Sequence, residues 1–191
     1  RITVPKHRTD ITIKSNRGFI SVRGVNGWLE ADTLTGYLAL VNLSGYVSAE
    51  TDNGDIMVQF VGQRFEGHSF QAKTKKGNVS VYLPTFYHAD LSLITLLGKP
   101  TVDYPPFTID DKEVEVVPQL KDEGGFINQR LRDGGAVILV QTDAGDVKLV
   151  KFDEDTEYLA PPPPPPAGDP PPPPNPEGEK QPPPKPEGEK S

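Results

Sequence analysis

The sequence predicts an all-β protein, a β-solenoid whose rungs hold about 18 residues and two strands each. Five glycines fall nine residues apart, at Gly18, Gly27, Gly36, Gly45 and Gly54. Apolar residues stand two and four positions after each glycine: Ile20 and Val22, Leu29 and Ala31, Leu38 and Leu40, Val47 and Ala49, and Ile56 and Val58. This alternation is typical of a strand with one buried face, whereas each such glycine would cost a helix about 1 kcal/mol.

The turns between these strands alternate between two types, so the full repeat is strand, turn, strand, turn. Ser15, Thr33 and Thr51 each stand three positions before a glycine, and they recur every 18 residues. The intervening turns contain Val25 and Leu43. Stacked rungs place equivalent residues above one another, so we expect a hydroxyl ladder at one corner and an apolar ladder at the other.

The pattern loosens after Phe60. Residues 62–67 resemble a loop insertion, and further strands are expected over 69–74, 78–83, 89–95, 126–131, 136–141 and 146–151. Residues 99–125 contain four prolines and are expected to be irregular, with one strand over 113–117, and to cover the end of the solenoid.

Composition divides the chain into a body, residues 1–160, and a proline-rich extended tail, residues 161–191. The tail holds 16 of the 22 prolines and favours polyproline II structure. It is either a stiff spacer or a strap that docks in an aromatic-lined groove of a partner. The candidate contact residues are Pro161, Pro162, Pro163, Pro164, Pro165, Pro166, Pro170, Pro171, Pro172, Pro173 and Pro174.

Composition also excludes several classes of protein. The chain has no Cys, which excludes a disulfide scaffold and a thiolate metal site. No apolar run approaches the roughly 18 residues of a membrane span. The net charge of −7 with no basic block disfavours nucleic acid as a partner. The chain starts at Arg1, so we expect a processed or truncated form whose upstream signal or anchor is not visible.

Several motifs occur in a fixed order along the body. They are Val4-Pro5-Lys6, the repeated Thr-x-x-Gly-x-Ile/Val-x-Val, the turns ending at Gly27 and Gly45, Val81-Tyr-Leu-Pro84, and Gly134-Gly followed by Thr142-x-x-Gly145. This set, over residues 2–151, resembles the bacterial adhesin-like family of toast-rack β-repeats. The resemblance implies a β-solenoid-like domain outside the cytoplasmic membrane, in a family without a catalytic motif or a common established activity. The proline-rich tail is not part of the family pattern.

The residues do not assemble a recognised catalytic or metal-binding motif. Calcium-binding β-rolls need an Asp in each turn, and only Asp55 and Asp146 directly follow a repeat glycine. Glu30 is the only acid in phase with the repeat on the outward strand positions. His7, His68 and His88 lack metal-ligand spacing. We therefore expect no enzyme activity, no cofactor and no metal.

Aromatic residues are the most informative outward feature. Phe19, Trp28, Tyr37 and Tyr46 directly follow repeat glycines, with parity opposite to the buried positions. Phe19 should stack near Tyr37 on one sheet, and Trp28 near Tyr46 on the other. Such rows suit a protein partner or a sugar face, although cross-strand pairing that only stabilises the sheets explains them as well.

These features predict a non-catalytic, extracytoplasmic scaffold, an accessory subunit bound to a membrane or envelope complex through the tail and one solenoid face. Its partners are expected to be other proteins of that assembly. The alternative is a carbohydrate-binding or surface-adhesion module that uses the aromatic rows.

Overall fold

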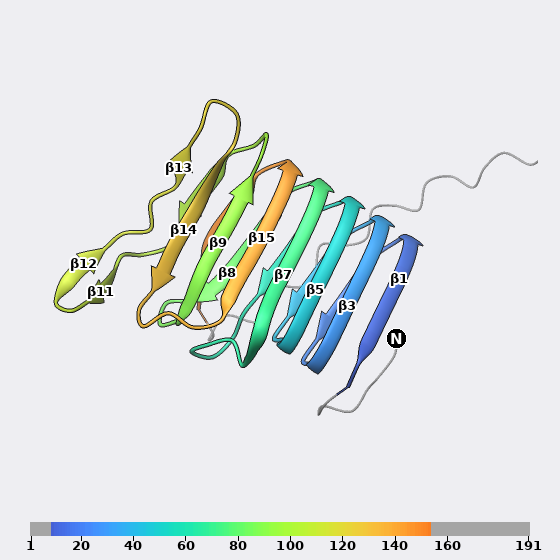
Figure 1. Cartoon of the computed structure of the whole chain (residues 1–191), viewed down its shortest axis with the longest axis horizontal. Helices are drawn as coiled ribbons and strands as arrows, with labels where there is room; N and C mark the ends of the chain where they lie inside the picture. Colours follow the sequence, from blue (N-terminus) through green and yellow to red (C-terminus); the bar gives the residue numbers. More distant parts are fainter. Residues whose placement is uncertain (1–8, 154–191) are drawn as a thin grey trace, which may run out of the picture.

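The computed structural model describes residues 9–153 of the chain, and every regular element in that range is a β-strand. Two large sheets face each other, and a small hairpin lies beside them (Figure 1). The eight-stranded sheet has the order β1 (Ile11–Arg17), β3 (Asn26–Thr35), β5 (Ser44–Asn53), β7 (Gly67–Lys76), β15 (Val137–Ala144), β9 (Ala89–Thr95), β14 (Gly125–Leu131) and β13 (Gln119–Leu120). The six-stranded sheet has the order β10 (Pro100–Asp103), β16 (Val147–Phe152), β8 (Val79–Pro84), β6 (Ile56–Gln59), β4 (Leu38–Val41) and β2 (Ile20–Arg23). The hairpin pairs β11 (Phe107–Ile109) with β12 (Lys112–Val114).

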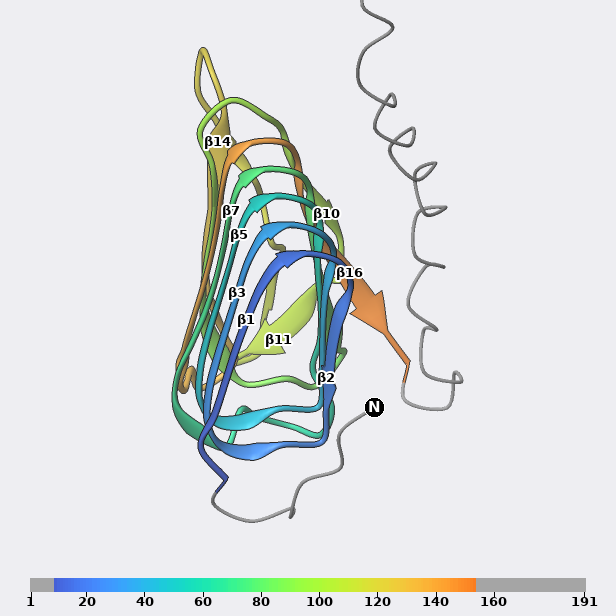
Figure 2. The ribbon, with the colours of Figure 1, turned by 90° about the vertical axis from the view of Figure 1, so that its right-hand side faces the viewer.

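The chain passes from one sheet to the other and back, so that each coil contributes one strand to each sheet. Neighbouring coils pair in parallel at the predicted spacing: Leu29 pairs with Ile11 on one side and Val47 on the other, 18 residues away in each direction. Viewed along the stack, the outlines of successive coils superpose (Figure 2). The all-β prediction and the 18-residue register are thus confirmed for the N-terminal half. Val47 pairs with Phe70 in β7, which lies 23 residues further along the chain and not 18. The five extra residues fall in the region of residues 62–67, where the sequence predicts a loop insertion.

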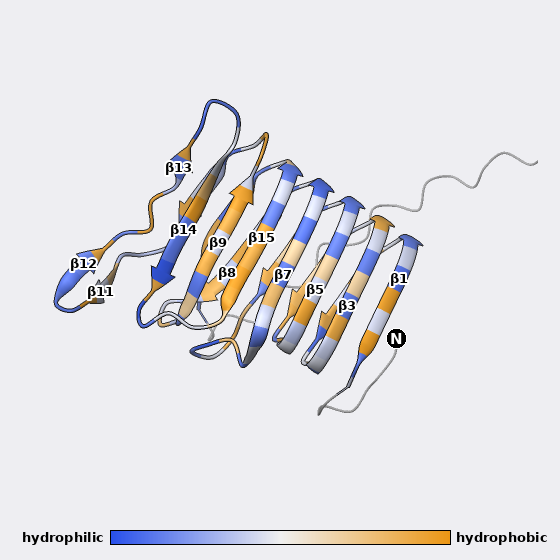
Figure 3. Ribbon diagram, in the orientation of Figure 1, coloured by the Kyte–Doolittle hydropathy of each residue, from blue (hydrophilic) through white to orange (hydrophobic). Residues whose placement is uncertain are grey.

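The hydrophobic core lies between the two large sheets. Ile20, Leu38 and Ile56 are buried there, as the alternation predicts. Strands β1, β3, β5 and β7 show the corresponding stripes of hydrophobic and hydrophilic residues (Figure 3). Val25 and Leu43 are also buried, at the second corner.

The hydroxyl ladder is present and longer than predicted. Ser15 pairs with Thr33, and the row continues through later strands, in the order Thr33, Thr51, Thr74, Thr142 and Thr95. Thr74, Thr142 and Thr95 each donate a hydrogen bond to the carbonyl oxygen of a turn glycine in a neighbouring coil, at 2.7–2.9 Å. These bonds satisfy carbonyl groups at a corner that the coils would otherwise bury.

The turn glycines stack in a column beside the threonines. At Gly54, φ is 155°, and a Cβ would lie 1.8 Å from the carbonyl oxygen of Gly36. No side chain fits at that distance, so the Thr-x-x-Gly spacing reflects both the ladder and the closeness of adjacent turns.

The order of coils in space departs from their order in the sequence. The last coil, β15 and β16, lies between β7–β8 and β9–β10. Ile138 of β15 pairs with Phe70 on one side and Leu91 on the other. This insertion is possible because β14 runs antiparallel to β9. It therefore returns the chain to the edge of the sheet where the parallel strands begin, and β15 can start there.

The segment expected to be irregular contains more structure than predicted. Residues 99–125 form β10, the β11–β12 hairpin and β13. The prediction of a single strand over 113–117 is wrong, because β12 ends at Val114. Pairing of β13 with β14 extends the sheet at that end of the stack, as Figure 1 shows. The hydroxyl of Tyr104 donates a buried 2.6 Å hydrogen bond to the carbonyl of Pro84, which ties this segment to β8.

The predicted proline-rich tail and its contact residues lie outside the described residues, as do His7 and the boundary at residue 160. Within residues 9–153, the structure contains no helix of the length and apolarity that membrane crossing requires.

Candidate functional site

The first candidate surface is the outer face of the eight-stranded sheet, where Trp28 and Tyr46 stack on each other. Their ring centroids are 4.1 Å apart with an interplanar angle of 26°. They come from paired positions of β3 and β5, as the register predicts. Trp28 is 50% exposed, and the pair is therefore the main aromatic feature on this face.

The rest of this face is largely polar. Lys14 contacts Asp32 at 3.4 Å, and Lys75 contacts Asp52 at 2.7 Å, each across adjacent strands. Lys75 donates a hydrogen bond to the Asp52 carboxylate, and this bond and then the negative charge of Asp52 raise the pKa of Lys75. All four side chains are well exposed, so these pairs contribute little stability, but they keep the face solvated.

The second aromatic pair lies on the outer face of the six-stranded sheet and is half-buried. Phe19 and Tyr37 stack with centroids 5.6 Å apart and an interplanar angle of 11°. They pack with Tyr82 against the buried residues Ala39, Val41 and Met57. Ala39, Val41 and Met57 point away from the core, as the sequence alternation predicts, but their side chains are buried and not exposed to solvent.

Burial on this face changes the acidity of Tyr37. Loss of solvent, followed by the proximity of Tyr82 and then of Asp55, raises the pKa of Tyr37 to about 12. The phenol is therefore neutral at physiological pH, and its hydroxyl lies beside an apolar cluster with a hydrogen that it can donate.

A third feature, which the sequence analysis missed, is a polar cleft near the β14–β15 turn. Its volume is about 370 Å³, and its lining includes His88, Asp110, Arg132, Asp133 and the exposed ring of Phe86. The guanidinium of Arg132 lies 4.8 Å from the centroid of the Phe86 ring. The sequence signals for this cleft are the acidic pair at 110–111 and the Asp-Gly-Gly sequence at 133–135, and neither by itself indicates that the two segments lie side by side.

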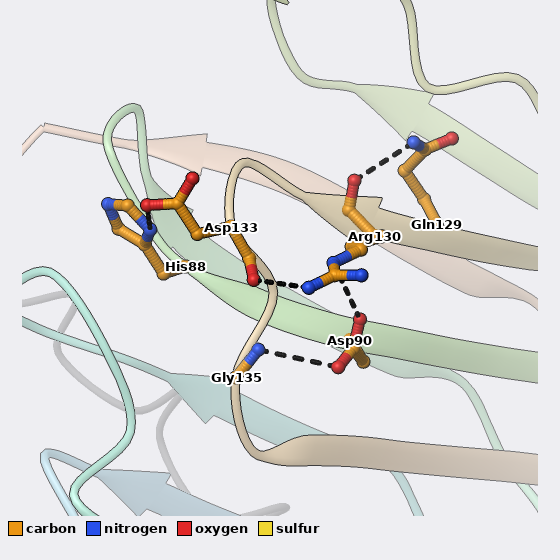
Figure 4. Close-up of polar contacts among 6 residues, drawn as sticks. All are labelled: His88, Asp90, Gln129, Arg130, Asp133 and Gly135. Carbon is orange, nitrogen blue, oxygen red and sulfur yellow. Dashed lines mark hydrogen bonds and ion pairs between the residues drawn. The ribbon is translucent and has the colours of Figure 1, made fainter. Parts of the chain in front are cut away.

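The polar contacts beside this cleft hold the turn between β14 and β15 in place (Figure 4). Nδ1 of His88 lies 3.5 Å from the Asp133 carboxylate, and Arg130 donates a 2.7 Å hydrogen bond to the Asp133 carbonyl. Asp90 approaches Arg130 at 3.9 Å and accepts a hydrogen bond from the Gly135 amide at 3.3 Å. The cluster joins the end of β14 to the start of β9 and holds the turn that leads into β15.

The acids singled out in the sequence also have structural partners. Asp55 accepts a 2.7 Å hydrogen bond from the Asn78 amide, and Asp146 accepts one of 2.8 Å from the Lys99 amide. Both carboxylates thus link the turns of adjacent coils. Within the part of the chain that the structure describes, no three His, Asp or Glu side chains gather in a group that could hold a metal ion.

Comparison of the chain with protein-family models, with curated proteins and with solved structures finds no match.

Proposed function

We propose that this protein is a non-catalytic scaffold, a β-solenoid of the toast-rack adhesin type that works outside the cytoplasm as an accessory subunit of a membrane or envelope complex. The parallel stacking of 18-residue coils supports the solenoid assignment. The motif set quoted above supports the family and the location.

The exposed Trp28–Tyr46 stack carries the proposal of a binding role. A half-exposed Trp on a rigid sheet face provides a large contact area with few rotatable bonds to immobilise, which is typical of the central residues of protein interfaces. The exposed Leu34, also on β3, adds apolar area on this strand. The surrounding ion pairs supply a polar rim.

The alternative function, binding of a carbohydrate, rests on the same aromatic pair. A sugar ring needs an open aromatic face, and Trp28 and Tyr46 cover one face of each other at 4.1 Å. The stacking therefore favours a protein partner, which also uses the ring edges and the neighbouring strand residues.

The experiment is a photocrosslinking assay on the full chain in the cell envelope of its source organism. A photoreactive amino acid at position 28 should give one discrete crosslinked protein. The same crosslinker at position 12, on the outer face of neighbouring β1, is the matched control and should give less product. The double substitution Trp28→Ser and Tyr46→Ser should abolish co-purification of the crosslinked protein.

A glycan array with the same double variant tests the alternative. Glycan binding that is lost in the double variant, together with no crosslinked protein at position 28, would replace the scaffold proposal by the carbohydrate-binding one. A double variant that melts at a lower temperature but retains its partner would reduce the stack to a structural role.

A further inference from the structure

The outer face of the six-stranded sheet carries an apolar cluster. Ala39, Val41 and Met57 are buried at its centre, and Phe19, Tyr37 and Tyr82 pack against them. Val41 is only 1% exposed although it alternates with the core residue Leu40. The burial of these outward-pointing residues indicates a cover on this face.

Gln59 adds an independent observation on the same face. It lies between Val41 and Tyr82 in the pairing of β4, β6 and β8, and it points away from the core because Val58 and Phe60 point inward. The residue is 1% exposed, and neither its amide nitrogen nor its amide oxygen has a hydrogen-bond partner among the described residues. A buried amide without partners costs free energy, so the two N–H groups of Gln59 favour a ligand that offers carbonyl oxygens here.

A polyproline II segment has the matching chemistry. Its carbonyl groups point outward without internal hydrogen bonds, and proline has no amide hydrogen, so the segment needs donors and apolar surface from its receptor. Gln59 supplies two N–H donors, and the neutral hydroxyl of Tyr37 supplies another. Exposed aromatic side chains are the usual means of holding proline rings.

The spacings also agree. Polyproline II repeats every three residues, about 9.3 Å, which is close to the roughly 9.6 Å across two strand spacings. A segment lying perpendicular to the strands therefore presents equivalent proline rings to every second strand.

We propose that this apolar cluster binds the proline-rich tail of the same chain, with residues 161–166 crossing β8, β6, β4 and β2. The chain leaves the described region from β16, which is the neighbour of β8 in this sheet, and Phe152 at its end is buried. Six prolines span about 19 Å, and the distance from β8 to β2 is about 14 Å. Residues 154–160 could reach up to about 23 Å if extended, enough to place the first proline over the apolar cluster. This inference stands independently of the proposed scaffold function, because it concerns the opposite outer face.

Paramagnetic NMR on the full chain tests the inference directly. The chain has no Cys, so Ala167→Cys gives a single attachment point for a nitroxide next to the first proline run. We expect the backbone amide signals of Val41 and Met57 to lose intensity, and that of Ser48 on the opposite outer face to retain it. The broadening should disappear with Gln59→Glu, which replaces the donor by a carboxylate, and persist with the matched change Gln71→Glu on the other outer face.

Replacement of residues 161–166 by Gly-Ser of equal length is the second variant, because it leaves the sheet untouched if Gln59→Glu fails to fold. It should expose Met57 and Val41 to faster amide exchange. Broadening that appears when a spin-labelled chain is mixed with an isotope-labelled chain without the nitroxide would show that the tail of a second copy binds the apolar cluster, and would overturn binding within one chain. Absence of broadening, or broadening that survives both variants, would also overturn the proposal, and deletion of residues 1–8 would then show whether the N-terminal segment covers the face.

Discussion

Substitution of one stacked glycine tests the column that sets the distance between coils. Gly54→Ala introduces a Cβ 1.8 Å from the carbonyl oxygen of Gly36, at a φ of 155° that side chains rarely adopt. The backbone conformation costs about 1–3 kcal/mol. Relief of the clash must separate the turns and break the hydrogen bonds from Gly36 to Asn53 and from Leu38 to Asp55, about 1 to 1.5 kcal/mol each.

The expected loss in the free energy of unfolding is therefore about 3 to 6 kcal/mol, a large part of the roughly 5 to 15 kcal/mol available to a domain. Urea denaturation of residues 1–191 measures it, and a chain that is already unfolded at 25 °C agrees with the upper value. Gly24→Ala is the control, because Gly24 has a φ of 64° but no atom within 4 Å of the added Cβ. It should cost only about 1 to 2 kcal/mol. A Gly54→Ala protein as stable as the control would refute the stacked column.

Three further predictions concern the ladder, the buried phenols and the turn cluster. Thr142→Val removes the donor to the Gly77 carbonyl and should lower the free energy of unfolding by about 1 to 2 kcal/mol in urea. Burial raises the pKa values of Tyr37 and Tyr104 to about 12, so above pH 10 these phenols ionise in the unfolded chain while they stay neutral in the folded one. Stability should then fall as pH rises from 10 to 12, by up to about 1.4 kcal/mol per pH unit for each phenol, as urea titrations at several pH values would show. Asp90→Asn breaks an exposed ion pair with Arg130 and should change stability by less than about 1 kcal/mol, and a larger loss would show that the turn depends on that charge.

The features that could be predicted from the sequence are those that each coil repeats. Alternation after Gly36 and Gly54 specifies which side chains enter the core, because successive residues of a strand point to opposite faces. The recurrence of Thr33 and Thr51 specifies the register, since stacked coils place equivalent residues in line. Stacking of Trp28 on Tyr46 follows from that register.

The order of the coils could not be predicted in this way. The strand at 137–144 has the same alternation as its neighbours, and a repeat pattern does not state which coil lies next to which. Insertion of β15 between β7 and β9 depends on the antiparallel return of β14 and on the turn held by Asp90 and Arg130. The polar cleft was missed for a related reason, because it joins residues 110 and 132–133, which lie in different irregular connections.

The two outer faces differ in a way that decides how each is used. On strands β1, β3, β5 and β7 of the eight-stranded sheet, several outward positions carry charged side chains, so this part of the face is stable in water and the exposed Trp28 is available to a separate molecule. On the six-stranded sheet, Val41, Met57 and Gln59 point outward and are nonetheless buried, which is why we propose a cover that supplies hydrogen-bond acceptors there. A cover carried by the same chain would act at any protein concentration, because the effective concentration of a linked segment does not depend on the amount of protein. If the tail binds as proposed, the variants at Trp28 and Gln59 should act independently of each other, because they change opposite outer faces.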